Sequence, residues 1–255
     1  MDRIALVSDI HGNIPALEAV FADINGRGVD RIFCLGDLVG KGPESDVAVD
    51  ICRGRCEKTV IGNWDAILAN EDSPSSLPEN VQTRNWYRRQ LGSERLLYLK
   101  NLPGTIEFPM SGRNVRLFHA SQQSVYYRVL HSDPLQKHLA MFDNTPFTGY
   151  SMMPDVVGYA DIHFAYEKTY GDKLLFNVGS VGNPLDKPLA CYGMLEGEYG
   201  SRNIAPFSLQ IIRLPYDIDL AVSRAHVSGM PEVVPYETEL RTARYRGLPA
   251  NRSAK

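Results

Sequence analysis

The sequence predicts an α/β fold, and three features of its first sixty residues support this prediction. Residues 4–7 and 31–35 are short apolar stretches of strand length, and residues 14–24 between them carry apolar side chains at helical spacing. This order predicts two parallel strands joined by a right-handed crossover. A third apolar strand, 58–61, follows a second helical stretch at 44–53. Such alternation is typical of a parallel sheet covered by helices.

The first of these helices has recognisable start and stop signals. Asn13 is a suitable N-cap, and Pro15 fits the first turn because its missing N–H would have no partner there. Gly26 and Gly28 follow the last apolar position and predict the end of the helix.

The composition is that of an ordinary globular protein and argues against several functional classes. The chain has 255 residues, 44% hydrophobic and 22% charged, with a formal net charge of −3. This charge gives no indication of an extended nucleic-acid groove. No apolar run approaches the roughly 20 residues that span a bilayer, and we expect no secretory signal sequence before the first strand. The four cysteines lack zinc-site spacing, so we expect reduced thiols in a cytoplasmic protein.

The rest of the chain predicts further elements within a single domain, residues 1–228. Residues 66–103 are predicted to form a helical excursion that covers one side of the site. A helix is expected at 217–227, and residues 229–255 are predicted to form a polar C-terminal tail, with the last ten or so disordered. Six more strands are expected, the first two paired antiparallel and the last two completing a second sheet: 105–108, 114–118, 155–158, 173–178, 190–195 and 208–214.

Polar side chains that could bind metal follow the predicted strands. Carboxyl ends of parallel strands meet at one edge of a sheet, where ligands bind in open α/β folds. The mixed nitrogen and oxygen donors suffice for two divalent ions of the manganese, iron or zinc type. Two such ions about 3.5–4 Å apart would grip the attacking and leaving oxygens of a phosphoryl transfer and generate a hydroxide at neutral pH. The candidate metal ligands are Asp9, His11, Asp37, Asn63, His119, Asp161 and His163.

The order of these motifs resembles the calcineurin-like metallophosphoesterases, over roughly residues 4 to 214. The motifs are Asp9-Ile10-His11, Gly36-Asp37, Gly62-Asn63-Trp64-Asp65, His119, Asp161-Ile162-His163 and the later Gly179-Ser180-Val181-Gly182-Asn183-Pro184 turn. The resemblance implies a four-layer α/β/β/α sandwich of two mixed sheets flanked by helices. It also implies that Asp9, His11, Asp37 and His163 hold the first ion. The second ion would be held by Asp37, Asn63, His119 and residue 161.

Three residues depart from the family pattern. Trp64 stands where the family usually has a histidine that helps to protonate the leaving group, and an indole N–H cannot titrate. Asp161 replaces the first histidine of a Gly-His-x-His motif, and Ala160 replaces its glycine. An alternative register would place Tyr159 and Asp161 at the two histidine positions and leave His163 outside the site.

These features predict a metal-dependent phosphoesterase with Asp37, Asn63 and His119 as the candidate catalytic residues. Metal-bound hydroxide would hydrolyse a phosphodiester or phosphoanhydride of a small phosphorylated substrate, with nucleotides and dinucleoside polyphosphates among the candidates. Trp64, by stacking on a base, and Lys41, as a point charge, are the candidate substrate-binding residues. The alternatives are a phosphomonoesterase or protein phosphatase using the same site, and a non-catalytic scaffold on this fold.

Overall fold

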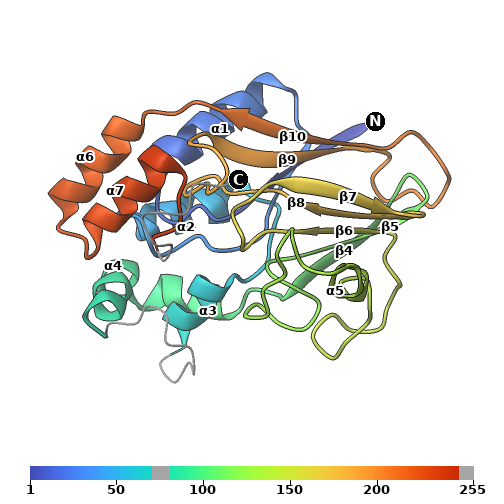
Figure 1. Ribbon diagram of the computed structural model, residues 1–255, viewed down its shortest axis with the longest axis horizontal. Helices are drawn as coiled ribbons and strands as arrows, with labels where there is room; N and C mark the ends of the chain where they lie inside the picture. The colour runs from blue at the N-terminus through green and yellow to red at the C-terminus, as the bar shows by residue number, and fades with distance from the viewer. Residues whose placement is uncertain (71–80, 247–255) are drawn as a thin grey trace.

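Two five-stranded mixed sheets lie face to face in the computed structural model, which describes residues 1–70 and 81–246 (Figure 1). The order of the first sheet is β10-β9-β1-β2-β3 and that of the second is β4-β5-β6-β8-β7. The first contains β1 (Asp2–Val7), β2 (Arg31–Cys34), β3 (Lys58–Thr59), β9 (Ala190–Gly197) and β10 (Ser208–Leu214). The second contains β4 (Thr105–Met110), β5 (Arg113–Phe118), β6 (Val156–Tyr159), β7 (Tyr166–Tyr170) and β8 (Lys173–Asn177).

Alternating side chains of β1 show why the sheets are stacked. Ile4 and Leu6 face the second sheet and pack in a cluster that includes Phe176. Ala5 and Val7 face the opposite way, into a cluster with apolar residues of the covering helices. All four strand residues are fully buried, as expected for a central strand covered on both faces.

Helices and loops form the two outer layers. The helices are α1 (Ile14–Gly26), α2 (Ser45–Arg55), α3 (Asn63–Ala69), α4 (Val81–Lys100), α5 (Leu135–Ala140), α6 (Ile218–Ser228) and α7 (Val233–Thr242). The first sheet is covered by α1, α2 and α4, whereas α5 and the surrounding loop, with Met141 and Phe142, cover the second. The predicted four-layer α/β/β/α sandwich is therefore confirmed. Asn13 caps α1 by accepting a hydrogen bond from the Ala16 N–H, as predicted.

The placement of the last two strands differs from the prediction. β9 and β10 belong to the first sheet, where β9 runs antiparallel to β1. The second sheet instead contains β7, which the sequence pattern did not reveal and which pairs antiparallel with β8. The predicted parallel pairing of β1 with β2 and the antiparallel pairing of β4 with β5 are both present.

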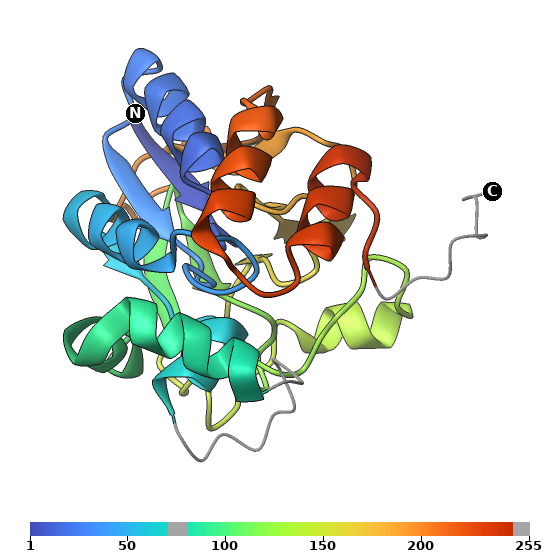
Figure 2. The same ribbon diagram turned by 90° about the vertical axis from the view of Figure 1, so that its left-hand side faces the viewer.

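The prediction of a polar tail from residue 229 onward was wrong for its first part. Residues 233–242 form α7, in which Tyr236 and Leu240 lie four positions apart and are fully buried against α6. Figure 2 shows α6 and α7 side by side. The predicted disorder of the last ten or so residues concerns positions that lie, from residue 247 onward, outside the described part of the chain, as do residues 71–80 of the predicted helical excursion.

Three further observations concern the residues that the structure describes. No helix among them is both long enough and apolar enough to cross a membrane. All four cysteines are unpaired, as expected. The helical excursion consists of α3 and α4, with Gly92 in the left-handed region at a kink within α4.

Candidate functional site

The residues that follow the strands adopt a strained backbone conformation. Within the described ranges, nine non-glycine residues have a positive φ, and six of these are predicted site residues. Such conformations cost free energy, cluster at functional sites, and persist only where the surrounding structure fixes them. Each one turns the chain sharply, so that two nearby side chains can point toward the same place. The six residues are Asp9, His11, Asp37, Lys41, Asp161 and His163.

The three predicted histidine ligands share one hydrogen-bonding arrangement. His11 Nδ1 lies 2.9 Å from the Val39 carbonyl oxygen, and His119 Nδ1 lies 2.7 Å from that of Leu35. The third, His163 Nδ1, lies 2.5 Å from the carbonyl oxygen of Asn183. A carbonyl only accepts, so each Nδ1 must donate. In each neutral imidazole the Nε2 atom then carries the lone pair that a metal ion requires.

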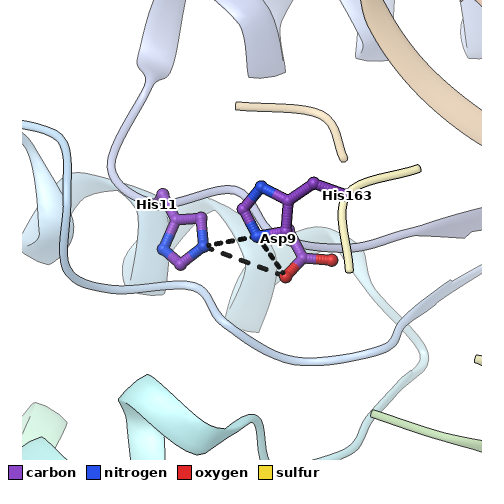
Figure 3. A group of neighbouring side chains, drawn as sticks. All are labelled: Asp9, His11 and His163. Atoms are coloured by element: carbon purple, nitrogen blue, oxygen red, sulfur yellow. Dashed lines mark hydrogen bonds and ion pairs between the residues drawn. The ribbon is translucent and has the colours of Figure 1, made fainter. Parts of the chain in front are cut away.

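The Nε2 atoms of His11 and His163 converge on Asp9, as Figure 3 shows. His163 Nε2 lies 3.1 Å from Asp9 Oδ1, and His11 Nε2 lies 3.2 Å from His163 Nε2. Two lone pairs that face each other at this distance repel unless a proton or a metal ion lies between them. Metal–nitrogen bonds of about 2.1 Å place two ligands of one ion about 3 Å apart, which matches the observed separation.

Buried polar atoms without hydrogen bonds give a second test of metal binding. Neither oxygen of Asp9, nor His119 Nε2, has a hydrogen-bond partner in the described part of the chain, although all three are buried. Such atoms are rare in folded proteins and need an explanation. Ligand atoms within 4.8 Å of one another make two candidate metal groups, Asp9–His11–His163 and Asp9–Asp37–His119. The residues present therefore fit divalent metal ions.

Asp37 lies between the two groups. Its Oδ2 atom is 3.6 Å from His11 Nε2 and 3.5 Å from His119 Nε2. Its Oδ1 atom accepts a hydrogen bond from the Trp64 N–H at 2.8 Å, and the same N–H lies 2.9 Å from Asn63 Oδ1. The side-chain oxygens of Asp37 and Asn63 thus both contact the Trp64 N–H, and Asp37 Oδ2 lies near a histidine of each group.

Asp65 fixes the two turns that carry Asp37 and Asn63. Its fully buried carboxylate accepts hydrogen bonds from the N–H groups of Asp37, Leu38 and Gly62, at 2.8, 3.0 and 3.0 Å. Gly62 is the N-cap of α3, so the same carboxylate both positions Asp37 and caps the helix. A side chain at Gly62 would place its Cβ 2.1 Å from Asp37 Oδ1, so only glycine fits there.

The surroundings of the site favour an ionised Asp9 and a neutral His11. Burial acts to raise the pKa of Asp9, but the charge and hydrogen bond of His163, followed by the charge of His119, outweigh it and lower that pKa. Burial, followed by the charge of Lys41, holds the pKa of His11 well below its usual value. Both protonation states are those of metal ligands.

Asp161 and His163 have different surroundings. Tyr159 faces away from the site, because its hydroxyl donates to the Val129 carbonyl at 2.8 Å. This geometry favours the register in which Asp161 and His163 face the site. Asp161 Oδ1 lies 3.9 Å from His119 Nε2, but both Asp161 oxygens accept hydrogen bonds from Arg128.

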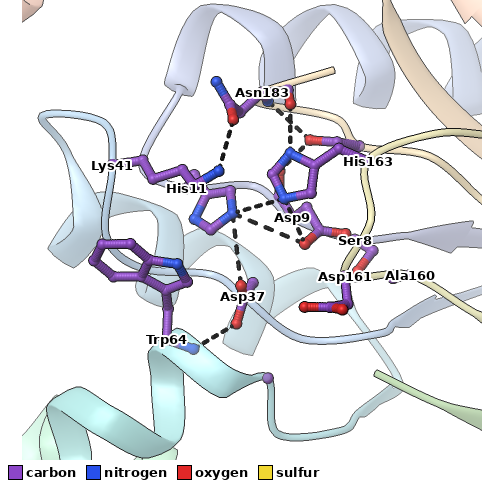
Figure 4. A network of polar contacts seen from close by, with 12 residues as sticks. Ser8, Asp9, His11, Asp37, Lys41, Trp64, Ala160, Asp161, His163 and Asn183 are labelled. Carbon is purple, nitrogen blue, oxygen red and sulfur yellow. Dashed lines mark hydrogen bonds and ion pairs between the residues drawn. The ribbon is translucent and has the colours of Figure 1, made fainter. Parts of the chain in front are cut away.

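The two predicted substrate-binding residues lie at the edge of the metal groups (Figure 4). Trp64 is 9% exposed, with its ring edge-on to His11 at 6.0 Å between centroids and to Tyr87 at 6.3 Å. This burial favours a packing role for Trp64 and leaves little indole surface for a base. Lys41 Nζ donates to Asn183 Oδ1 at 2.9 Å.

Three supporting residues were not predicted as part of the site. Arg128 lies in an irregular loop and belongs to no motif. Asn183, expected mainly to shape a turn, binds both His163 and Lys41. Glu239 of α7 is fully buried and accepts a hydrogen bond from the Asn183 side chain at 3.1 Å. The Asn183-Pro184 motif was the available signal for Asn183, whereas Arg128 and Glu239 had none.

Comparison with known proteins agrees with this geometry. Residues 2–199 match the calcineurin-like phosphoesterase superfamily domain. An uncharacterised protein of Methanocaldococcus jannaschii is 32% identical over 235 residues, which cover 90% of this chain and 94% of that protein. Two solved structures share the fold. A metallophosphoesterase from Sphaerobacter thermophilus has a TM-score of 0.72 and 23% identity, covering 95% of this chain and 99% of its own. A hypothetical protein from Pyrococcus horikoshii has a TM-score of 0.71 and 17% identity, covering 97% and 99%. Because the family domain spans more than half of the sequence, this chain belongs to the calcineurin-like phosphoesterase superfamily.

Proposed function

We propose that this protein is a metal-dependent phosphohydrolase that cleaves a phosphodiester or a phosphoanhydride of a small phosphorylated molecule. The observation that carries the proposal is the set of buried atoms around Asp9. Its two oxygens and His119 Nε2 lack hydrogen bonds to described residues, and His11 Nε2 lies 3.2 Å from His163 Nε2. Family membership makes phosphoester hydrolysis the chemistry that such a site would perform.

Two divalent ions are proposed to bind here. Asp9, His11, Asp37 and His163 would hold the first, and Asp37, Asn63 and His119 would hold the second. When bound, such ions lower the pKa of a water molecule and neutralise charge on the transferring phosphoryl group. Asp161 completes the predicted ligand set, but both of its oxygens are engaged by Arg128. No serine or cysteine nucleophile is needed.

The choice of a diester or anhydride over a monoester rests on Trp64. Its indole N–H cannot supply a titrating proton to a leaving group. A leaving group that is already stable as an anion needs less protonation, and such groups occur in activated diesters and in anhydrides. We propose nucleotides and dinucleoside polyphosphates as candidate substrates because they contain these bonds.

Turnover of model substrates tests this proposal. The protein is loaded with manganese, iron or zinc and assayed with bis-p-nitrophenyl phosphate and p-nitrophenyl phosphate. We expect faster turnover of the diester, and faster turnover of the monoester would favour a phosphomonoesterase. Failure to bind any metal after loading, measured by elemental analysis, would overturn the proposal in favour of a non-catalytic scaffold.

A further inference from the structure

Asp161 is the predicted metal ligand whose two oxygens are both engaged by another side chain. Arg128 Nε donates to Oδ2 at 2.8 Å, and Arg128 Nη2 donates to Oδ1 at 2.8 Å. This two-pronged pairing of guanidinium and carboxylate is the strongest common form of ion pair and fixes both groups in one plane. Asp161 therefore has a partner that satisfies it without an ion.

The pair connects the buried site with its surface. The Asp161 side chain is 3% exposed, whereas the Arg128 side chain is 48% exposed. Asp161 Oδ1 also lies 3.9 Å from His119 Nε2, so Arg128 is separated from the metal groups by one carboxylate oxygen. A partly exposed positive charge thus lies next to the buried metal groups.

Most donors of Arg128 remain available to a ligand. A guanidinium has five N–H bonds, and the pair with Asp161 uses two of them. Asp161 accepts both of the hydrogen bonds that this guanidinium donates to residues 1–70 and 81–246. Its remaining N–H groups form a fork that suits two oxygens of a phosphate.

The loop around Arg128 is held in place, so the guanidinium is positioned before a ligand binds. The carbonyl of Val129 accepts a hydrogen bond from the Tyr159 hydroxyl at 2.8 Å. The carbonyl of Leu130 lies 2.9 Å from Nε2 of the buried His138. Positioning of this kind lowers the entropy cost of binding.

We propose that Arg128 binds the substrate phosphate and that Asp161 is its positioning residue rather than a ligand of the second ion. This inference rests on the proposed function, since it assigns a phosphate-binding residue to the same site. It explains the departure at residue 161. A neutral histidine has one acceptor atom and could not accept two hydrogen bonds from Arg128.

Binding of inorganic phosphate to the manganese-loaded protein, measured by calorimetry, tests the inference without requiring turnover. We expect Arg128→Gln to weaken phosphate binding about 10- to 100-fold, because a charged two-pronged contact is lost. Arg128→Lys should recover only part of the affinity, since an ammonium cannot form the fork. Manganese content, from elemental analysis, should be unchanged in both variants and in Asp161→Asn.

Arg95→Gln is a matched control. Arg95 pairs with Asp50 in the same two-pronged way, at 2.8 and 2.6 Å, but joins α4 to α2 rather than facing the metal groups. Phosphate binding should be unaffected by this substitution. A circular dichroism melt of each variant identifies any loss of folding.

Three results would overturn the inference: wild-type protein that binds no phosphate, wild-type affinity in Arg128→Gln, or loss of manganese from Arg128→Gln or Asp161→Asn. The last result would return Asp161 to the metal ligands. The proposed function fails separately. Protein that binds phosphate through Arg128 but hydrolyses neither model substrate would overturn the proposed function and leave this inference standing.

Discussion

The turn at Gly182 holds the Asp9 backbone in place, and an alanine there should disturb the whole site. A Cβ at residue 182 would lie 1.8 Å from the Ile10 carbonyl oxygen, whereas carbon and oxygen normally stay about 3.3 Å apart. The turn must therefore retreat by roughly 1.5 Å. The obstacle is backbone, which cannot rotate out of the way as a flexible side chain can.

That displacement breaks the contacts that join the turn to the end of β1. Gly182 N and Ser180 Oγ both donate to the Asp9 carbonyl at 2.9 Å, and Val181 N donates to the Ser8 carbonyl at 2.9 Å. Each bond contributes about 1 kcal/mol, so we expect Gly182→Ala to lower the free energy of unfolding by about 2–4 kcal/mol. Because Asp9 loses its support, manganese affinity should fall about 10- to 100-fold.

Urea denaturation measures the first effect, with Trp64 and Trp86 as fluorescent probes and chelator present so that metal binding does not contribute. Calorimetric titration with manganese measures the second. Gly54→Ala is the control. A Cβ at Gly54 meets nothing within 4 Å, and alanine within a helix should stabilise the protein by about 0.5–1 kcal/mol. An unchanged urea midpoint and manganese affinity in Gly182→Ala would refute the reasoning.

Three other predictions concern Glu239, Asp65 and the metal itself. Burial acts to raise the pKa of Glu239, but hydrogen bonds from Arg246 and the charge of Lys41 outweigh it and lower this pKa to about 2. A lowered folded-state pKa stabilises the protein above the unfolded value near 4.5, and this contribution is lost as the pH falls toward 2. Glu239→Gln should therefore lower the free energy of unfolding by about 3 kcal/mol at pH 7. Urea denaturation should show this difference between the wild-type protein and the variant becoming smaller below about pH 5, and a difference independent of pH would contradict this assignment. Asp65→Ala leaves three buried N–H groups without an acceptor and should lower the free energy of unfolding, measured by thermal melts, by at least about 3 kcal/mol. The control is Asp217→Asn at the exposed N-cap of α6, which should leave the free energy of unfolding nearly unchanged. Manganese at 100 times its dissociation constant should stabilise the wild-type protein by about 2.7 kcal/mol relative to protein in chelator, and an unchanged melting temperature would argue against a built metal site.

Sequence reasoning predicted the site because strand order restricts where polar residues can meet. Once β1 and β2 are taken as parallel neighbours, Asp9 and Asp37 must leave the sheet at the same edge. The structure agrees, since Asp9 N donates to the Gly36 carbonyl and His11 N donates to the Asp37 carbonyl. Metal chemistry adds a restriction on residue type, so candidate donors can be recognised in the sequence.

The position of β9 shows what a local pattern leaves open. An alternating or apolar stretch predicts a strand but does not identify the strand with which it pairs. A signal was nevertheless present in β1, where residues 4–7 are all apolar. A strand buried on both faces is central and needs a neighbour along each edge. β2 occupies one edge, so a second partner, which proves to be β9, was required.

Helix α7 was missed because composition averages over a segment. Residues 229–255 are mostly polar, yet two apolar residues one helical turn apart, Tyr236 and Leu240, anchor the helix on α6. The role of Glu239 depends on a partner more than fifty positions away, Asn183. A contact at that separation leaves no local trace in the sequence.

The contacts that support the site also leave no local trace in the sequence. His11, His119 and His163 each donate Nδ1–H to a backbone carbonyl, and a carbonyl is present at every residue. No residue type therefore marks the groups that orient these ligands. Asp161 is the reverse case, since its residue type was conspicuous while its partner Arg128 was not. The Asp161 carboxylate accepts two hydrogen bonds from the Arg128 guanidinium, one at each oxygen, and a neutral histidine could not accept both. The aspartate at 161 is thus accounted for by the arginine beside it, without requiring an ion.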